Sequence, residues 1–137
     1  MDEPLNLVLF SGTDDKLQAA AVLTAGAAAL GRPVNVFLQY WALGAFRADR
    51  IQADHGLAPE AGSDGRAAVD ALRAAGQASW AETLRQAKEL GGVDIEACSL
   101  SMDLLRLAPS DLDPLVDGVE GITSFYLNAG DGQVIFI

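Results

Sequence analysis

Cys98 is the only cysteine of the chain, and it lies where cysteine does chemistry in α/β proteins. Residues 93–98 predict a strand, and residues 99–105 predict the turn and helix that follow it. Ligands and functional groups of open parallel sheets gather at the carboxyl ends of the strands. A thiol at a helix N-terminus also meets the positive end of the helix dipole, which favours the nucleophilic thiolate. Cys98 is therefore a candidate nucleophile, and the alternative is a buried cysteine that packs as a small hydrophobic side chain.

Other kinds of active site lack the residues that they need. The one histidine, His55, belongs to no paired ligand motif, so no metal site is predicted, and His55 is expected to be a solvated loop residue. The chain has no G-x-S-x-G sequence, which argues against a serine hydrolase. The Ser11–Lys16 segment lacks the spacing of a phosphate loop and places two carboxylates where an anion would bind. This segment is therefore expected to cap a helix through Thr13 or Asp14, and no cofactor is implied.

The composition is that of a folded, acidic protein. The length of 137 residues suits one domain over residues 1–137, and a hydrophobic content of 50% excludes a disordered chain. Nine Lys and Arg residues stand against nineteen Asp and Glu residues, which gives a formal net charge of -10. Binding to nucleic acid or to an anionic membrane needs a basic face, so neither is an expected partner.

The expected compartment is the cytoplasm. A single cysteine forms no internal disulfide, which excludes a secreted disulfide scaffold. The acidic start Met1-Asp2-Glu3-Pro4 lacks the positive charge of a signal peptide. No apolar run reaches the ~20 residues that cross a bilayer.

Strand and helix patterns alternate along the chain and would position Cys98. Strands are predicted at residues 5–10, 34–40, 93–98, 115–120 and 133–137, and helices at residues 16–30, 66–75, 80–90, 102–107 and 121–129. Ser79 and Glu82 form a capping box before one of these helices, and Ser110 is expected to cap a further turn. The alternation implies a parallel sheet covered by helices on both faces. The segment 47–77 is either a lid or binding segment or a loosely ordered connector.

Several stretches, in order along nearly the whole chain, resemble the DsrE-like family of sulfur-relay proteins, which includes DsrE-, DsrF- and DsrH-like chains. The likeness is greatest to a subgroup often described as peroxiredoxin-like. The specific parts are Val34–Leu43, which contains Tyr40-Trp41, and Ala97–Asp103, which contains Cys98. Weaker matches lie at residues 15–31, 117–120 and 135–137.

The resemblance implies a three-layer α/β/α fold with a five-stranded parallel sheet, assembled as a homotrimer or homohexamer. It also implies a cysteine that carries sulfane sulfur as a persulfide, and only Cys98 matches that cysteine. The partners would be sulfur-donor and sulfur-acceptor proteins or small sulfane-sulfur compounds. Departures from the family pattern at Gln39, Ala42 and Leu100 bear on the substrate more than on the fold. Because a second cysteine is lacking, a self-contained thiol peroxidase cycle is not expected.

The first functional hypothesis is thus a cytoplasmic sulfur carrier or sulfurtransferase with Cys98 as its nucleophile. The residues expected to form the pocket or to stabilise the sulfur anion are Ser99, Leu100, Ser101, Tyr40 and Trp41. Backbone N–H groups after Cys98 would favour the anion, whereas the carboxylate of Asp103 would oppose it. Tyr40 and Trp41 either wall the pocket or pack at a subunit interface. The alternative hypothesis is a non-catalytic oligomeric binding or assembly protein in which Cys98 is a core residue.

Self-association is also expected from the apolar side chains. Ala-rich helix faces add to a cluster past the end of one strand, formed by Tyr40, Trp41, Leu43 and Phe46. Together they present more apolar surface than a small acidic monomer readily leaves in water, and closed symmetry is the usual result. The Trp41 region is therefore expected at or near a subunit contact, with Cys98 in a pocket close to it.

Overall fold

Five parallel strands form the centre of the computed structural model, which describes residues 3–137. The strands are β1 (Leu5–Leu9), β2 (Val34–Leu38), β3 (Val93–Cys98), β4 (Gly118–Glu120) and β5 (Val134–Phe136). Their order in the sheet is β4-β3-β2-β1-β5, and every neighbouring pair is parallel. The predicted five-stranded parallel sheet is confirmed.

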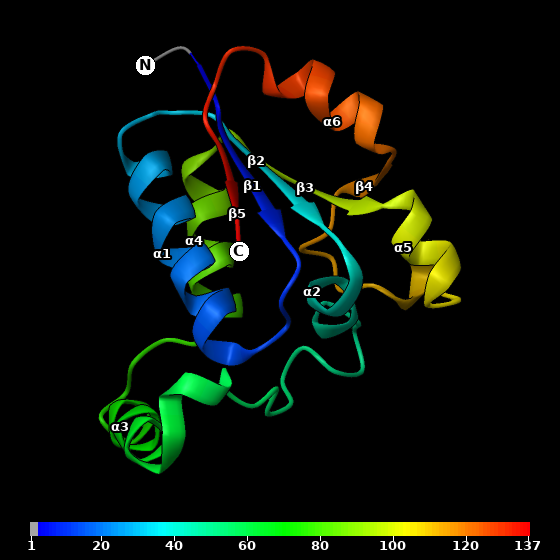
Figure 1. Ribbon diagram of the computed structural model, residues 1–137. Coiled ribbons are helices and arrows are strands. Elements are labelled where there is room, and N and C mark those ends of the chain that lie inside the picture. The colour runs from blue at the N-terminus through cyan, green and yellow to red at the C-terminus, as the bar shows by residue number, and fades with distance from the viewer. Residues whose placement is uncertain (1–2) are drawn as a thin grey trace.

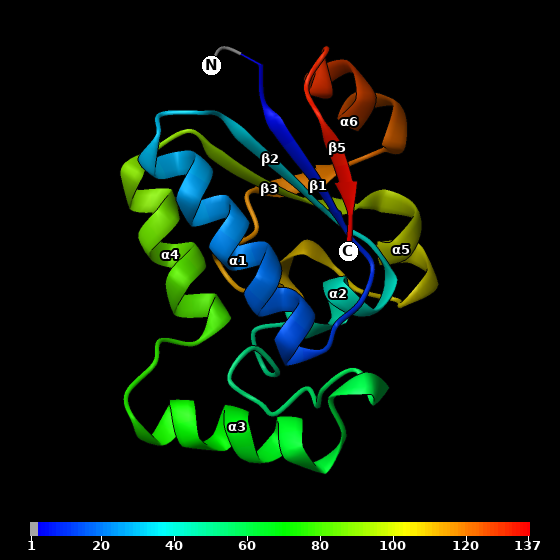
Figure 2. The same ribbon diagram turned by 60° about the vertical axis from the view of Figure 1, so that its left-hand side comes forward.

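Helices cover both faces of this sheet. The α-helices of the described residues are α1 (Asp14–Ala29), α2 (Tyr40–Ala45), α3 (Gly62–Ala74), α4 (Trp80–Leu90), α5 (Ser99–Leu104) and α6 (Ile122–Ala129). Figure 1 and Figure 2 show α1 and α4 on one face, α6 on the other, and α2 and α5 following the carboxyl ends of β2 and β3. The three-layer arrangement is therefore as predicted. Between residues 3 and 137, no helix is long and apolar enough to cross a membrane.

The larger hydrophobic core lies between the sheet and the helices α1 and α4. Alternate side chains of the three central strands point into it because strand residues face opposite sides in turn. These core residues are Leu5, Leu7, Leu9, Val34, Val36, Leu38, Ile95 and Ala97. The alanines of α1 that face them, among them Ala20, Ala21 and Ala27, are buried. The Ala-rich face thus lets α1 lie close to the sheet and to α4, and it is not free surface.

Two asparagines on the opposite face of the sheet hold the end of α6. The Nδ2 atom of the buried Asn6 donates to the carbonyl oxygens of Ala129 at 3.2 Å and Gln133 at 2.9 Å. The Nδ2 atom of Asn35 donates to Asn6 Oδ1 at 2.9 Å and to the carbonyl oxygen of Asn128 at 3.2 Å. The last carbonyls of a helix have no partner within the helix. These bonds satisfy the carbonyls of Asn128 and Ala129 and fix the C-terminal end of α6 on the sheet.

Three helices begin earlier than the sequence predicts, α1 at Asp14 rather than at residue 16, α3 at Gly62 rather than at residue 66, and α5; a fourth helix, α2, is not predicted. α5 begins at Ser99 rather than at residue 102, because Cys98 itself is the N-cap residue. Residues 41–46, expected as an apolar segment past a strand that ends at Tyr40, lie largely in the short helix α2, and β2 ends at Leu38. The expected exposure of this segment is partly wrong, since Leu43 and Phe46 are fully buried.

The predicted helix caps are confirmed at Ser79, confirmed in position only at Thr13, and wrong at Ser110. Ser79 caps α4, because its Oγ atom accepts a hydrogen bond from the backbone N–H of Glu82 at 3.2 Å. Thr13 is the N-cap residue of α1, but its side chain makes no capping hydrogen bond. Ser110 lies inside a 3-10 turn, where Asp111 instead accepts from the Ala108 N–H at 2.8 Å.

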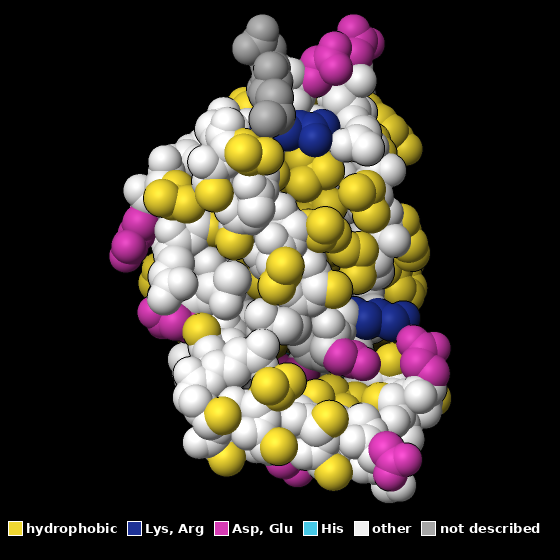
Figure 3. Space-filling model, turned by 90° about the vertical axis from the view of Figure 1, so that its left-hand side faces the viewer, with side chains coloured by type: hydrophobic (Ala, Val, Ile, Leu, Met, Phe, Trp, Pro, Cys, Tyr) yellow, Lys and Arg dark blue, Asp and Glu magenta, His cyan; other side chains and the backbone are white. Residues whose placement is uncertain are grey.

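The segment 47–77 contains a well-formed helix that does not join the core. No residue of α3 is buried. Two ion pairs tie the helix to the rest of the molecule, Arg66 to Asp54 at 3.2 Å and Arg73 to Asp14 at 3.0 Å. Figure 3 shows the crease that remains between α3 and the body, with acidic side chains along it. α3 is therefore held mainly by charge.

Candidate functional site

Cys98 lies at the strand-to-helix junction that the sequence predicts, as the last residue of β3 and the N-cap of α5. Its side chain belongs to a small apolar cluster on the α6 face of the sheet, with Val8, Phe37 and Phe125. The rings of Phe37 and Phe125 stack with their centroids 5.0 Å apart. Cys98 is 5% exposed, so its side chain is almost wholly covered in the folded chain.

Carboxylates lie beside Cys98 on the same face of β3 and β4. Cys98 pairs in register with Glu120, and Glu96 pairs with Gly118. The Glu96 carboxylate fills the space over Gly118, since a Cβ atom there would lie 2.7 Å from Glu96 Oε2. Glu120 Oε2 accepts a hydrogen bond from Asn128 Nδ2 of α6 at 3.2 Å. The carboxylate of Glu120 therefore belongs to the register partner of Cys98 on the neighbouring strand, which the sequence did not indicate.

The carboxylates of this face hold protons more tightly than isolated acids. Burial, together with the charges of Asp94 and Glu120, raises the pKa of Glu96 from 4.5 to about 7. Burial also raises the pKa of Asp94 and of Glu120. Crowding of like charges on a half-buried face favours the neutral acid. Glu96 is thus neutral in much of the folded protein at neutral pH.

The raised pKa of Glu96 predicts a loss of stability as the pH rises. The folded state binds a proton that the unfolded state has released, so this contribution is complete below pH 4.5 and is lost as the pH rises through about 7. The Glu96 carboxyl is half-exposed, so solvent screens part of its effect. Between about pH 5 and about pH 8, we expect the free energy of unfolding to fall by about 1 kcal/mol less in Glu96→Gln than in the wild type. Urea unfolding at both pH values measures it. Glu89→Gln, at an exposed position, is the charge-matched control. The same pH dependence of the free energy of unfolding in both variants would contradict the role given to Glu96.

The other sequence-predicted site residues fall into two groups. Ser101 is fully buried, and its Oγ atom accepts a hydrogen bond from the backbone N–H of Tyr40 at 3.0 Å. This bond joins α5 to the start of α2. Ser99 and Leu100 are exposed, and Trp41 is 59% exposed. The structure therefore brings Ser101 and Tyr40 together, while Leu100 and Trp41 face solvent.

A pocket of about 590 Å³, which we call the edge pocket, opens beside α2 at the carboxyl edge of the sheet. Its lining comes from the loop after β1, from α2, from residues 47–55, and from Leu105 after α5. Tyr40 and Trp41 line it, as do Arg47, Arg50 and His55. Cys98 does not line the edge pocket. The edge pocket therefore contains the expected walls Tyr40 and Trp41 without the candidate nucleophile.

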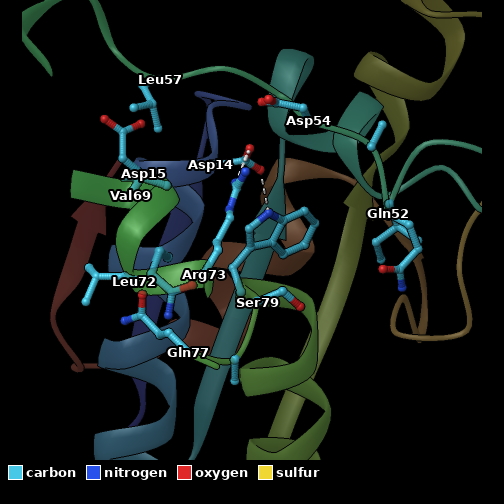
Figure 4. Close-up of a pocket in the computed structure, with 15 residues that line it drawn as sticks. Asp14, Asp15, Gln52, Asp54, Leu57, Val69, Leu72, Arg73, Gln77 and Ser79 are labelled. Carbon is cyan, nitrogen blue, oxygen red and sulfur yellow. Dashed lines mark hydrogen bonds and ion pairs between the residues drawn. The ribbon is translucent and has the colours of Figure 1, made fainter. Parts of the chain in front are cut away.

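A second pocket of about 500 Å³ lies under α3, and the buried carboxylate of Asp14 lies at its wall. Asp14 Oδ1 accepts from Trp80 Nε1 at 3.0 Å, and Oδ2 accepts from an Arg73 guanidinium nitrogen and from the His55 backbone N–H, each at 3.0 Å. Figure 4 shows Arg73 extending from α3 toward Asp14. The sequence identified Asp14 as a helix cap and missed this network, which joins four segments of the chain.

His55 is not the solvated loop residue that the sequence predicts. It is half-buried, and its ring lies 5.9 Å from the ring of Trp80. Among the residues that the structure describes, the buried Nε2 atom has no hydrogen-bond partner. The bond from its backbone to Asp14 draws it inward, and nothing local in the sequence signals that contact. Residues 3–137 contain no group of three His, Cys, Asp or Glu side chains that could hold a metal ion.

Comparison with known proteins identifies a matching family, a similar sequence and two similar structures. Residues 1–62 match the sequence profile of the DsrE/DsrF/DrsH-like family. YrkE of Bacillus subtilis strain 168 is 28% identical over 149 aligned positions, which cover 93% of this chain and 92% of YrkE. The crystal structure of YchN from E. coli matches all of both chains with a TM-score of 0.59 and 14% identity. MTH1491 from Methanobacterium thermoautotrophicum has a TM-score of 0.54 and 16% identity, over 99% of this chain and 100% of its own. At these identities, the two structures are evidence for the fold alone.

Proposed function

This chain belongs to the DsrE/DsrF/DsrH-like family, and from that premise we propose that it is a cytoplasmic sulfur carrier or sulfurtransferase. As a single DsrE-like domain, it would hold sulfane sulfur as a persulfide on Cys98. The observation that carries the proposal is the position of Cys98 at the carboxyl end of β3 and the start of α5. Parallel sheets gather their functional groups at this edge. The chain has no second cysteine to do the same work.

The proposed reaction is two successive thiol exchanges. The Cys98 thiol loses its proton, and its sulfur attacks the outer sulfur of a donor such as thiosulfate. The new S–S bond forms as the S–S bond of the donor breaks, and sulfite leaves with the electron pair. An acceptor thiolate then attacks the outer sulfur of the persulfide, and the Cys98 sulfur leaves as thiolate. The donor supplies the sulfane sulfur and the acceptor supplies the second thiolate, so no further oxidant or reductant is needed.

Glu120 is the group that we assign to take the thiol proton. It pairs in register with Cys98, on the same face of the sheet. Its pKa is raised, chiefly by burial, which brings a carboxylate closer to the range in which it works as a base. Its hydrogen bond with Asn128 links it to α6, the same helix that carries Phe125, which packs in the apolar cluster with Cys98. A movement of α6 would therefore change both the access to Cys98 and the position of the carboxylate.

The test of the proposal is the intact mass of the native protein after incubation with thiosulfate or a polysulfide. We expect a gain of about 32 Da, the mass of one sulfur atom, which a reductant removes. A protein that gains no mass with either donor would support the alternative function, an oligomeric binding or assembly protein with Cys98 in its core. That alternative is favoured by the low exposure of Cys98.

Phe125 is expected to control the access of reagents to Cys98. Phe125→Leu replaces the ring of a side chain that packs in the cluster with Cys98, and it removes the stack with Phe37. We expect native-state alkylation of Cys98 to become up to about tenfold faster, because a weaker cover lowers the free energy of local opening. Rates are measured by mass spectrometry under native conditions. Leu127→Ala, on the same helix but 79% exposed, is the control, and an equal gain there would contradict the gating role.

We further propose that the chain assembles as a homotrimer or homohexamer. Apolar side chains are exposed on α1, at Val22 and Leu23, and more of them are exposed on the outer side of α6 and on β5. The exposed side chains there are Ile122, Tyr126, Leu127, Val134 and Phe136. Figure 3 shows hydrophobic side chains gathered toward its right-hand side, where β5 lies. β5 also ends the sheet and leaves one edge unpaired within the described chain. Surface of this kind is typical of a subunit contact.

Light scattering coupled to size exclusion tests the assembly. We expect a mass of three or six times the chain mass of 14.3 kDa. Phe136→Glu should reduce it to one chain mass, because Phe136 is 65% exposed on β5 and a buried unpaired charge is costly. Trp41→Glu is a second test variant, because the sequence predicts Trp41 at or near a subunit contact. A wild-type mass close to 14.3 kDa would exclude the assembly.

A further inference from the structure

The edge pocket has the size and the position of a small-molecule site. Its volume of about 590 Å³ lies within the range of ligand pockets in proteins. It opens where β1 and β2 end, and parallel sheets bind ligands at that edge. Cys98 does not line it, so its occupant is a separate question from sulfur transfer.

The lining of the edge pocket is cationic in a strongly acidic protein. Arg47 and Arg50 line it, in a chain with a net charge of -10. The carboxylate in the lining, Asp54, is paired with Arg66 at 3.2 Å. Arg47 is paired with Asp49 at 2.8 Å. Within residues 3–137, the guanidinium of Arg50 has no ion-pair or hydrogen-bond partner. Arg50 is therefore available to an anion.

Neutral donors and a flat apolar wall surround these arginines. The hydroxyl oxygens of Ser11 and Thr13 lie 3.4 Å apart at the mouth of the loop that leads into α1. The largely exposed ring of Trp41 forms a wall, and the rings of Tyr40 and Trp41 meet edge to face with centroids 5.9 Å apart. Hydroxyls and guanidinium groups bind oxyanions, whereas an exposed indole binds a flat apolar group.

The walls of the pocket are fixed by the chain itself. The loop after β1 approaches α2 so closely that only glycine fits at residue 12, where a Cβ atom would lie 2.3 Å from the Trp41 carbonyl oxygen. Tyr40 has a φ of 43°, which is strained for a residue other than glycine. The Ser101 hydroxyl holds its backbone N–H. Backbone strain of this kind persists where the surroundings impose it, and it is common at binding sites.

We propose that the edge pocket binds a small organic anion, with a carboxylate or phosphoryl head on Arg50 and a flat apolar body against Trp41. The free guanidinium supplies the charge, the Ser11 and Thr13 hydroxyls supply donors, and the volume exceeds what an inorganic anion fills. The pocket under α3 takes no such ligand, because its lining carries Asp14, Asp15 and Asp54 against Arg73.

Isothermal titration calorimetry with phenyl phosphate and benzoate tests the proposal on the wild-type assembly. Benzamide is the neutral isostere of benzoate, and inorganic phosphate is the head without the body. We expect both aromatic anions to bind and to change the fluorescence of Trp41, with benzamide and phosphate weaker. Arg50→Gln should weaken the anions by at least about tenfold, the value of one charge-assisted hydrogen bond. Arg32→Gln, at the amino end of β2, removes the same charge far from the pocket and should leave the affinity unchanged.

Three results would overturn the proposal. One is the absence of saturable binding by both aromatic anions. Another is equal affinity for benzoate and benzamide, which would leave no role for the guanidinium. The third is an equal loss of affinity in Arg50→Gln and Arg32→Gln, which would reduce the effect to net charge. Light scattering on each variant separates a lost pocket from a lost assembly, and Trp41→Phe should bind with the fluorescence change removed.

Discussion

Cys98→Ser is expected to abolish the uptake of sulfane sulfur while the protein stays folded. A serine hydroxyl forms no bond to sulfur that is equivalent to a persulfide, so the mass gain of about 32 Da should disappear completely. The substitution places a hydroxyl among Val8, Phe37 and Phe125. We therefore expect it to cost about 1–3 kcal/mol in the free energy of unfolding. Intact-mass spectra before and after the donor measure the uptake, and urea unfolding measures the cost.

Cys98→Ala is the matched variant, because it removes the sulfur without placing a polar group in the apolar cluster. Both variants should fail equally to take up sulfane sulfur, because both lack the thiol. Only Cys98→Ser introduces an unpaired hydroxyl. An acceptor thiol added to the wild-type protein that carries the persulfide should remove the extra sulfur and restore the original mass. A mass gain that persists in either variant would show that the sulfur binds elsewhere, and the carrier proposal would fail.

The fold was largely predictable because its central strands are short apolar runs between clear turns. Residues 5–9 and 34–38 are nearly continuous in apolar side chains, as strands buried on both faces are. α3 was harder to place because it buries no residue against the body. Apolar periodicity gives little signal for a helix that packs on no core. The same pattern contains no information about the ion pairs that hold α3.

The candidate site was predictable only where it is local in sequence. Cys98 ends a strand and starts a helix, and both patterns lie within a few residues of it. Glu120 and Phe125 reach Cys98 through the pairing of β4 and the crossing of α6, which no local pattern specifies. Asp14 is the clearest miss. Its partners His55, Arg73 and Trp80 lie 41, 59 and 66 residues away, so the sequence indicates only a carboxylate at a helix start.

Asp14→Ala is expected to be among the most destabilising single substitutions in the chain. Asp14 is 6% exposed, and it accepts hydrogen bonds from three donors that would all lose their partner. The Trp80 indole N–H is buried, and the Arg73 guanidinium tethers α3. Leaving the buried Trp80 N–H without an acceptor costs about 1–3 kcal/mol in the free energy of unfolding, and the lost pair with Arg73 adds less because the Arg73 side chain is 45% exposed. Urea unfolding followed by tryptophan fluorescence measures this cost.

Asp15→Ala separates this network from the general effect of acid at a helix start. Asp15 shares the first turn of α1, so both variants lose the same favourable interaction with the helix dipole. Asp15 is more exposed and accepts from the backbone N–H groups of Ala58 and Lys16, so its loss should cost about 1 kcal/mol. Asp14→Ala should also release α3, seen as faster proteolysis within residues 62–79, whereas Asp15→Ala should not. Equal costs for the two variants would mean that Asp14 acts only as a helix-start carboxylate. A larger cost without faster proteolysis would assign its stabilisation to Trp80 and His55 rather than to the tether through Arg73.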